Sequence, residues 1–471
     1  MSLFSQYLLQ RQFCISFEYL TTQKTHLVPT TFAGFPVCMT LADRVQSDTD
    51  IAPLEAMQDY PQSIEKILHY SGKGRDISDF QTFLKDAQQH GVENLLLLSG
   101  DKLKQHQDGA NDPTLRSRYL ESVNQVMAAK DYGGFYLGVA FNPFKYAEAE
   151  KDAQYFKLNK KIQAGADYVI TQLGFDMDVL SSYQRYMQQY YPRVPVLACV
   201  MPLTFARARF MAKQKVAGIV LSADVLNFLQ QEQQTDAIQA EQNVYARCAL
   251  QILMCQHLGY AGVHLSACHK VEEQEKLQKA ILQFATLTFE QCLAKWKMLW
   301  RSSVDVNFHP TGANNHKAPV EQVLKYKSMH VMHELFFSSK LAKGVGSYIF
   351  AAKLWQKPKA DAALLKTEFI SKHGIVGCEN CGQCRLGETL YICPETCPKG
   401  LANGPCGGSN LDRCEFEDRE CIHSVKARLA KAVGQEKMLK QELIPTVAIE
   451  TRHSSSWKNW FVPPTTPQAE Q

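Results

Sequence analysis

The sequence lacks a long hydrophobic run and a recognisable leader. No segment reaches the roughly 18 consecutive apolar residues that a membrane-spanning helix needs. The N-terminal stretch MSLFSQYLLQRQFC has neither a leading basic region nor an uninterrupted apolar core. We therefore predict a cytoplasmic protein that makes no contact with a membrane.

The sequence also lacks a strong excess of charge of either sign. Lysine and arginine number 51 against 47 aspartate and glutamate, a net charge of +4, and no basic block of the kind that tracks nucleic acid is present. Hydrophobic residues make up 45% of the 471 residues, enough for a sizeable core. The length predicts two or three folded domains. The balanced charge predicts that the protein has no nucleic-acid partner.

Cysteine is plentiful but unevenly placed. Seven of the 15 cysteines are scattered through residues 1–300 in apolar surroundings such as FCIS and LACVM, where we expect small buried side chains. The other eight lie between Cys378 and Cys421. In a large chain without an export signal, reduced thiols are expected rather than disulfides.

Short apolar runs alternate with amphipathic stretches from residue 12 to about 290. The eight runs are QFCISFE, FPVCMTL, SIEKILHY, VENLLLLSGD, FYLGVAF, DYVITQL, VPVLACVM and AGVHLSA. This pattern predicts an α/β fold, a (β/α)8 TIM barrel, followed by a small helical and cysteine-rich domain. An open doubly wound sheet is the alternative, but no GxGxxG follows the first run. VAGIVLS at 216–222 is a ninth strand candidate.

The ends of helices are marked by capping residues and glycines. Ser78 with Gln81 at the third position predicts a helix start, Gly91 predicts its end, and Gly259 ends a later helix. We expect a barrel over 1–295, a linker and helical segment over 296–370 with two helices over 319–357, a cysteine-rich domain over 371–435 and a C-terminal tail over 436–471. The last twenty or so residues of the tail are expected to be extended or disordered.

Polar residues follow six of the predicted strands. Barrel enzymes place their chemistry at the carboxyl ends of the strands, where the loops converge. A carboxylate in a partly apolar cavity would have a raised pKa and could donate a proton, and an amide can both donate and accept hydrogen bonds to a planar heterocycle. These residues are Glu18, Thr40, His69, Asp101, Asn142 and Gln172.

Three motifs carry a family resemblance. SFEYLTT, LLLLSGD and KKIQAGADYVITQLGFD resemble the first strand, the leucine-rich strand and the Lys-x-x-Ala-Gly-Ala segment of methylenetetrahydrofolate reductases. The resemblance covers roughly residues 12 to 285. It implies a flavoprotein oxidoreductase of one-carbon and methionine metabolism that binds FAD and a folate.

The resemblance also implies roles for single residues. The general acid falls on Glu18, the acid that tunes flavin and folate falls on Asp101, and the folate-binding glutamine falls on Gln172. Phe205 falls on a residue that contacts substrate or nicotinamide. Flavin contacts are implied for Thr40, His69, Gly100, Asp101, Ala140 and Lys161.

The sequence departs from the family at four expected flavin contacts. Ser99 stands where the family has arginine, Asn142 where it has tyrosine, Tyr146 where it has histidine and Gln154 where it has aspartate. Each lost contact would cost on the order of 1 to 3 kcal/mol of flavin binding.

The cysteine block has the composition of a metal site. Eight thiols in so short a segment, with CxxCxxC at its start, predict bound metal, either iron–sulfur clusters or zinc. His423 could replace one thiol. The block resembles the C-terminal domain found with some bacterial methylenetetrahydrofolate reductases. The predicted ligands are Cys378, Cys381, Cys384, Cys393, Cys397, Cys406, Cys414 and Cys421.

Two functions fit these features. In the first, the chain reduces 5,10-methylenetetrahydrofolate to 5-methyltetrahydrofolate through a flavin, with electrons from NAD(P)H or a redox partner protein. In the second, suggested by the four departures, it is a flavin-free folate-binding or iron–sulfur electron-transfer subunit that works beside a partner reductase.

Overall fold

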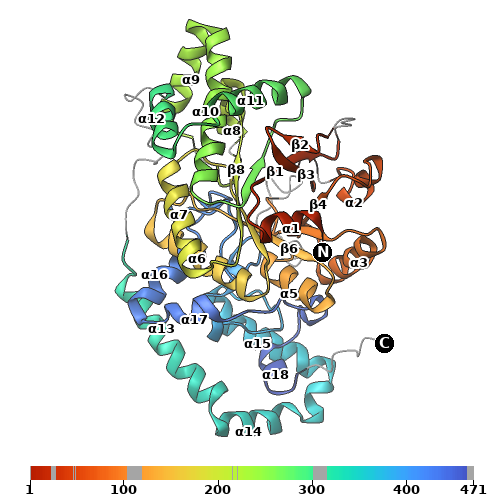
Figure 1. Cartoon of the computed structure of the whole chain (residues 1–471). Helices are drawn as coiled ribbons and strands as arrows, with labels where there is room; N and C mark the ends of the chain where they lie inside the picture. The colour runs from red at the N-terminus through yellow and green to blue at the C-terminus, as the bar shows by residue number, and fades with distance from the viewer. Residues whose placement is uncertain are drawn as a thin grey trace.

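The computed structural model describes residues 2–22, 28–45, 47, 49–102, 119–214, 216–219, 221–300 and 316–463. Eight parallel strands form a closed barrel in which the first strand pairs with both the second and the last. The barrel strands are β1 (Cys14–Leu20), β3 (Phe35–Ala42), β4 (Lys66–Ser71), β5 (Asn94–Leu98), β6 (Tyr136–Phe141), β7 (Tyr168–Thr171), β8 (Val196–Val200) and β9 (Gly262–Leu265). All eight predicted strands and the TIM barrel are confirmed (Figure 1).

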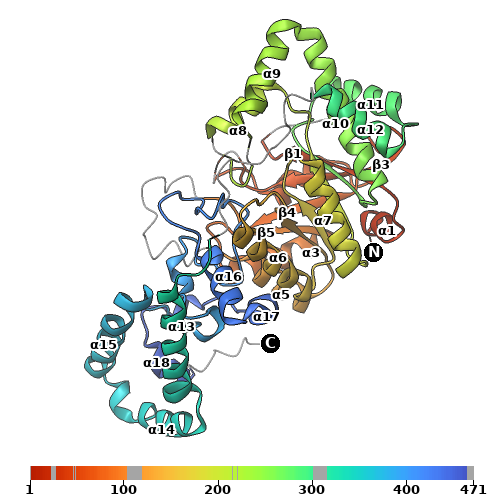
Figure 2. The ribbon, with the colours of Figure 1, turned by 90° about the vertical axis from the view of Figure 1, so that its left-hand side faces the viewer.

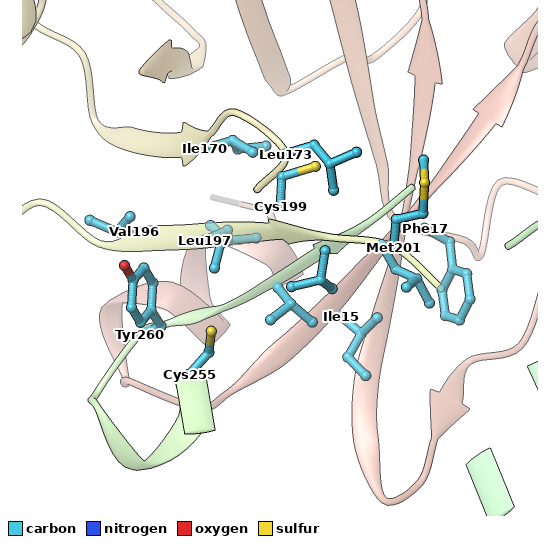
Figure 3. Packing of buried hydrophobic residues seen from close by; sticks show 14 of the residues in the cluster. Ile15, Phe17, Ile170, Leu173, Val196, Leu197, Cys199, Met201, Cys255 and Tyr260 are labelled. Carbon is cyan, nitrogen blue, oxygen red and sulfur yellow. The ribbon is translucent and has the colours of Figure 1, made fainter. Parts of the chain in front are cut away.

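The barrel strands read as continuous apolar runs because both faces of a parallel sheet are covered. Buried apolar side chains pack against both faces of the sheet, and Figure 3 shows Ile15, Phe17, Leu197 and Cys199 among them. All seven cysteines before residue 300 are free and buried, as predicted. A short strand β2 (Thr31–Phe32) pairs antiparallel with β3 and lies outside the barrel.

Helices surround the barrel. The helix at Ile77–Gln89 (α3) is capped by Asp76, which forms a capping box with Asp79, so the predicted cap at Ser78 was wrong. Asp76 accepts hydrogen bonds from the Ser78 and Asp79 amides and starts the helix two residues earlier than Ser78 would. The other helices of this half are α1 (Leu3–Leu9), α2 (Pro53–Ala56), α5 (Ser122–Tyr132), α6 (Glu148–Gln163), α7 (Met177–Tyr190), α8 (Phe205–Gln214), α9 (Ala223–Thr235), α10 (Ala237–His257), α11 (Val271–Phe284) and α12 (Phe289–Leu299).

The ninth strand candidate is not a strand. Residues 216–219 form a turn between α8 and α9, and Ser222 caps α9. Gly218 in this turn has a φ of +77° and lies so close to Gly407 that an added Cβ would sit 2.3 Å from the Gly407 carbonyl oxygen. The apolar run therefore forms a loop over the strand ends.

The second half of the chain is helical and irregular. The expected linker falls largely on residues 301–315, which lie outside the described residues. The two helices predicted after it are α13 (Val320–His333) and α14 (Lys340–Phe350). The remaining helices are α15 (Pro358–Val376), α16 (Ile422–Val433), α17 (Glu436–Gln441) and α18 (Ser456–Phe461). Within the described part of the chain, no helix is long and apolar enough to cross a membrane.

Two of the expected boundaries need correction. Residue 295 falls inside α12, whose Trp296 packs in the barrel core together with Trp300. The tail expected over 436–471 contains α17 and α18. Helix α17 packs on α6, and Phe461 of α18 stacks on Phe350 of α14 with ring centroids 5.5 Å apart. Apolar residues at helical spacing, missed in so polar a segment, hold both helices in place.

The cysteine-rich module docks on the barrel. Helices α16 and α17 pack against α6, as Figure 1 shows, and the irregular segment around residues 397–415 reaches the carboxyl ends of β5 and β6. Lys157 of α6 forms a buried ion pair with Glu121, with Nζ 2.9 Å from Oε1, and Glu121 also accepts from the Ala402 and Asn403 amides. The module is thus joined to the barrel through buried polar contacts.

Candidate functional site

Ionisable side chains from three barrel strands meet at one end of the barrel. Glu18 lies near the end of β1, beside Thr40 of β3 in the sheet register. His264 of β9 has Nε2 3.8 Å from Glu18 Oε1, and Ser266 donates a hydrogen bond to Glu18 Oε2. His69 of β4 lies with its ring 6.0 Å from that of His264.

Glu18 is a carboxylate in this arrangement. Burial raises its pKa, but hydrogen bonding and electrostatic attraction from His264, together with the hydrogen bond from Ser266, outweigh burial and hold the pKa at about 2. The prediction of a raised pKa was wrong, because it took account of burial and not of partners from other strands. His264 is fixed from its other side, where Nδ1 lies 3.0 Å from Ser16 Oγ.

His69 is buried and neutral. Burial, together with the neighbouring His264, lowers its pKa to about 4. Its Nε2 is buried and makes no hydrogen bond among the described residues. Thr40 is fully buried and donates to the Phe17 carbonyl oxygen at 3.3 Å. His69 therefore keeps one ring nitrogen available for a bound molecule.

Gly100 and Asp101 lie just after β5. Gly100 has a φ of +86°, and an added Cβ would meet the Ser71 hydroxyl at 2.3 Å, so only glycine fits. Its carbonyl oxygen accepts a hydrogen bond from Lys399 of the module at 2.8 Å. Asp101 is exposed, and its negative charge adds to that of Glu415 in raising the pKa of Lys399 against the effect of burial. The loop that follows, residues 103–118, lies outside the described residues.

Gln172 and Asn142 are both engaged by the turn at residues 216–219. Gln172 donates to the Ala217 carbonyl oxygen at 3.1 Å and accepts from the Leu173 amide. Asn142 donates to the carbonyl oxygens of Gly218, at 2.9 Å, and Gly407, at 3.0 Å. A ligand of Gln172 would have to replace the contact with Ala217.

The remaining predicted residues lie on or beside two helices, α6 and α8. Lys161 of α6 donates to the Ala140 carbonyl oxygen at 2.6 Å, and burial lowers its pKa to about 7. Phe205 begins α8 and is half-buried, with the Arg209 guanidinium 5.5 Å from its ring centre.

The four departures from the family pattern make protein contacts. Gln154 donates to the Cys406 carbonyl oxygen at 2.7 Å, and Asn142 binds Gly407, so two of the four hold the cysteine-rich module. Tyr146 donates to Asp176 at 3.5 Å, and Ser99 accepts from the Ser122 amide.

The eight cysteines of the block divide into two sets of four, in chain order. Each set lines one cavity. We call these the first and second cysteine cavities. The first is lined by Cys378, Cys381, Cys384 and Cys393, and the second by Cys397, Cys406, Cys414 and Cys421.

Neither cavity is closed around a single ion. Among the described residues, no group of three or more histidine, cysteine, aspartate or glutamate side chains is arranged to hold one metal ion. Zinc needs its thiolates about 2.3 Å away in a tetrahedron. His423 also lines the second cavity, and its buried Nε2 makes no hydrogen bond within the described ranges.

The second cysteine cavity lies at the mouth of the barrel. Glu415 lines it, accepts a hydrogen bond from Cys406 Sγ at 3.3 Å and pairs with the buried Lys399. Lys399 in turn binds Gly100, and the Lys102 amide donates to Glu415 at 2.8 Å. Glu415 and Lys399 thus link the second cysteine cavity to Gly100, the residue beside Asp101.

Sequence reasoning missed His264, Ser266, Lys399 and Glu415. A histidine inside the apolar run AGVHLSA was the one available signal for His264, since a polar residue in a buried strand needs a partner. Lys399 and Glu415 lie in an irregular segment, and the sequence pattern around them does not indicate where that segment contacts the barrel.

Comparison with known proteins covers both halves of the chain. Residues 6–284 match the family model for methylenetetrahydrofolate reductase, and residues 358–450 match the model described as methylene-tetrahydrofolate reductase C terminal. Methylenetetrahydrofolate reductase 2 of Saccharomyces cerevisiae is 27% identical over 148 residues, which cover 30% of this chain and 24% of the yeast protein. A probable methylenetetrahydrofolate reductase (NADPH) of Caenorhabditis elegans is 27% identical over 164 residues, 34% of this chain and 23% of the worm protein.

The match thus spans about a quarter of the length of these relatives. Among solved structures, an uncharacterized protein from Clostridium thermocellum that binds two copies of 5-methyl-5,6,7,8-tetrahydrofolic acid aligns with a TM-score of 0.43 and 16% identity, over 60% of this chain and 99% of that one. Because the family model spans more than half of the residues, the chain belongs to the methylenetetrahydrofolate reductase family.

Proposed function

We propose that the protein reduces 5,10-methylenetetrahydrofolate to 5-methyltetrahydrofolate. The observation that carries the proposal is the set of Glu18, His264 and His69 at the carboxyl ends of the strands, in a barrel of this family. Glu18 protonates the bridging nitrogen, the five-membered ring opens to an iminium, and a hydride completes the methyl group. Asp101 stabilises the cationic folate, and Gln172 binds the pterin after releasing Ala217.

The proton must reach Glu18 before it can be donated. With a pKa of about 2, Glu18 carries no proton near neutrality in the ligand-free protein. His264 lies 3.8 Å away and is itself held by Ser16, so it is the group placed to pass a proton to the carboxylate.

The barrel residues fit a flavin at one end. The unpartnered His69 Nε2, the buried Thr40 and the close backbone approach at Gly100 suit the ring of FAD, with Ala140 and Lys161 alongside. When bound, the flavin supplies the hydride. At Asn142 and Gln154, two positions where the family has flavin contacts, the side chains bind the cysteine-rich module.

The two cysteine cavities have the donor set of iron–sulfur clusters. Four thiols line each cavity, the number that one cluster uses, although four thiolates would also hold a zinc ion. Clusters held there would carry single electrons. The second cavity lies beside Gly100, so electrons entering the module would arrive at the barrel mouth.

Anaerobic reoxidation of the reduced flavin tests the reaction. We expect protein purified under argon to contain flavin and iron, and its reduced flavin to be reoxidised when methylenetetrahydrofolate is added. Glu18→Gln should slow this step by a factor of about 10² to 10⁴ while leaving flavin content unchanged. Flavin that is present but stays reduced would exclude the proposal.

The second candidate is a flavin-free subunit that passes electrons to a partner reductase. It is favoured by the contacts of Asn142 and Gln154, which occupy positions expected to bind flavin. Its signature is a protein that holds about eight irons per chain and folate but no flavin. Metal analysis and an absorption spectrum of the same sample separate the two candidates.

A further inference from the structure

Helices α13 and α14 expose apolar stripes of helical spacing. Val320, Leu324, Val331 and Leu335 lie along one face of α13 and its continuation, and all are more than half exposed. On α14, Leu341 and Tyr348 are 80% and 84% exposed, with Val345 between them. Soluble proteins rarely leave such stripes bare, so these faces are candidates for a docking surface. We call residues 320–376, which comprise α13, α14 and α15, the arm.

The inner side of the arm packs against α18. Gly346 of α14 lies against the ring of Phe461 in α18, and Phe350 stacks on the same ring. The exposed stripe is therefore the outer face, directed away from the body. Figure 2 shows the arm at the end of the molecule opposite α9 to α12.

The arm carries the positive charge of the protein. Nine lysines and four acidic residues lie between residues 320 and 376, a net charge of +5 in a chain whose total is +4. Two of the acids are taken up within the fold, since Glu368 is buried against Lys372 and Asp361 pairs with Lys458. Lys340, Lys343 and Lys353 remain exposed beside the apolar stripe of α14.

The arm also forms one wall of the first cysteine cavity. Tyr326 and Met329 of α13 pack against a buried cluster that includes Val376 and Cys393, and both of these line the cavity. At the end of α15, Lys372 Nζ lies 3.9 Å from Cys384 Sγ, and His373 Nδ1 lies 2.9 Å from the Cys378 carbonyl oxygen. A protein bound to the arm would lie close to this cavity.

We propose that the arm is the docking surface for a small acidic redox carrier protein, which delivers electrons at the first cysteine cavity. The inference rests on the proposed function, because it names the electron source for that reaction. Each transfer oxidises the carrier by one electron and reduces the centre held by the four thiols by one, so two transfers serve one methylene group.

Charge decides among the possible occupants. In a dimer formed through this face, two arms that each carry a net charge of +5 would repel each other. An anionic lipid surface would form ion pairs with the lysines, but it would not account for the four-cysteine cavity beside them. An acidic carrier would form ion pairs with the exposed lysines, bury the apolar stripe and deliver electrons at the first cysteine cavity.

Binding of an acidic ferredoxin and of a flavodoxin to the full, metal-loaded chain tests the proposal. We expect the triple variant Lys340→Glu/Lys343→Glu/Lys353→Glu to weaken binding of the carrier about tenfold or more at low salt, with the difference shrinking at high salt. Leu341→Ser/Tyr348→Ser should weaken it at all salt concentrations. The matched control, Lys213→Glu/Lys279→Glu/Lys297→Glu, makes the same charge change at exposed lysines of α8, α11 and α12.

Several results would overturn the proposal. They are binding of neither carrier, equal weakening by the arm and control variants, a dimer in sedimentation that Leu341→Ser/Tyr348→Ser dissociates, or arm-dependent binding to phosphatidylglycerol vesicles in place of the carriers. The binding assay contains no folate. A protein that binds the carrier but fails to reduce methylenetetrahydrofolate would contradict the proposed reaction and leave the docking surface standing.

Discussion

The protonation state of single residues at the strand ends depends on partners that lie far away in the sequence. Ser266 and Glu18 are 248 residues apart, yet their hydrogen bond helps to keep Glu18 ionised. Glu18 could be found from its position after an apolar run. Its charge state could not, since burial alone predicts the opposite shift in pKa.

Lys161 should make stability rise with pH, because burial lowers its pKa in the folded protein. Its pKa is about 7 in the folded protein and 10.5 when exposed, so the unfolded chain binds more protons between these values. Stability should therefore rise from pH 7 to 10, by up to an amount on the order of 4 kcal/mol relative to Lys161→Met. Urea unfolding of both proteins at pH 6.5 and 9.5 measures the difference. Lys151→Met, exposed on the same helix, is the control and should show no such trend.

At the scale of elements, the barrel was predictable and the docking of the module was not. Parallel strands covered on both faces read as apolar runs, and all eight were visible. The module is held differently, because Asn142, Lys145, Gln154 and Lys157 donate mainly to its backbone carbonyl oxygens. A carbonyl oxygen is present at every residue and leaves no trace in the sequence.

The ion pair between α6 and Glu121 should be the most sensitive contact of this interface. Lys157→Met leaves the Glu121 carboxylate buried without its cation and should destabilise the protein by about 3 to 5 kcal/mol. Lys151→Met on the exposed face of α6 should change the free energy of unfolding by less than about 0.5 kcal/mol. Equal effects of the two substitutions in denaturant unfolding would show that the interface carries no such energy.

At the scale of the whole molecule, the barrel and the module form one body. The spacing of the eight cysteines predicts that they bind metal, but their division into two cavities in chain order appears only in the folded protein. The position of the second cavity beside Gly100 appears only there as well.

Removal of residues 301–471 should therefore impair the barrel itself. The truncated protein exposes the Lys157 and Glu121 side chains and the apolar faces of α6 that α16 and α17 cover. We expect the full chain to unfold in a single calorimetric transition, and residues 1–300 to be less stable and more prone to aggregation. Two well-separated transitions in the full chain, with the second matching the isolated barrel, would contradict this expectation.

The contacts between Lys145 and the segment around Gly407 have a consequence for biogenesis. These residues are 262 positions apart, so the contact cannot form until the segment around Gly407 has left the ribosome, well after the barrel strands. The carboxyl ends of β5 and β6 stay uncovered until then, and the cysteines that would hold metal are made after the barrel. Metal delivery and the closing of the barrel mouth should therefore be late and linked steps in the maturation of this protein.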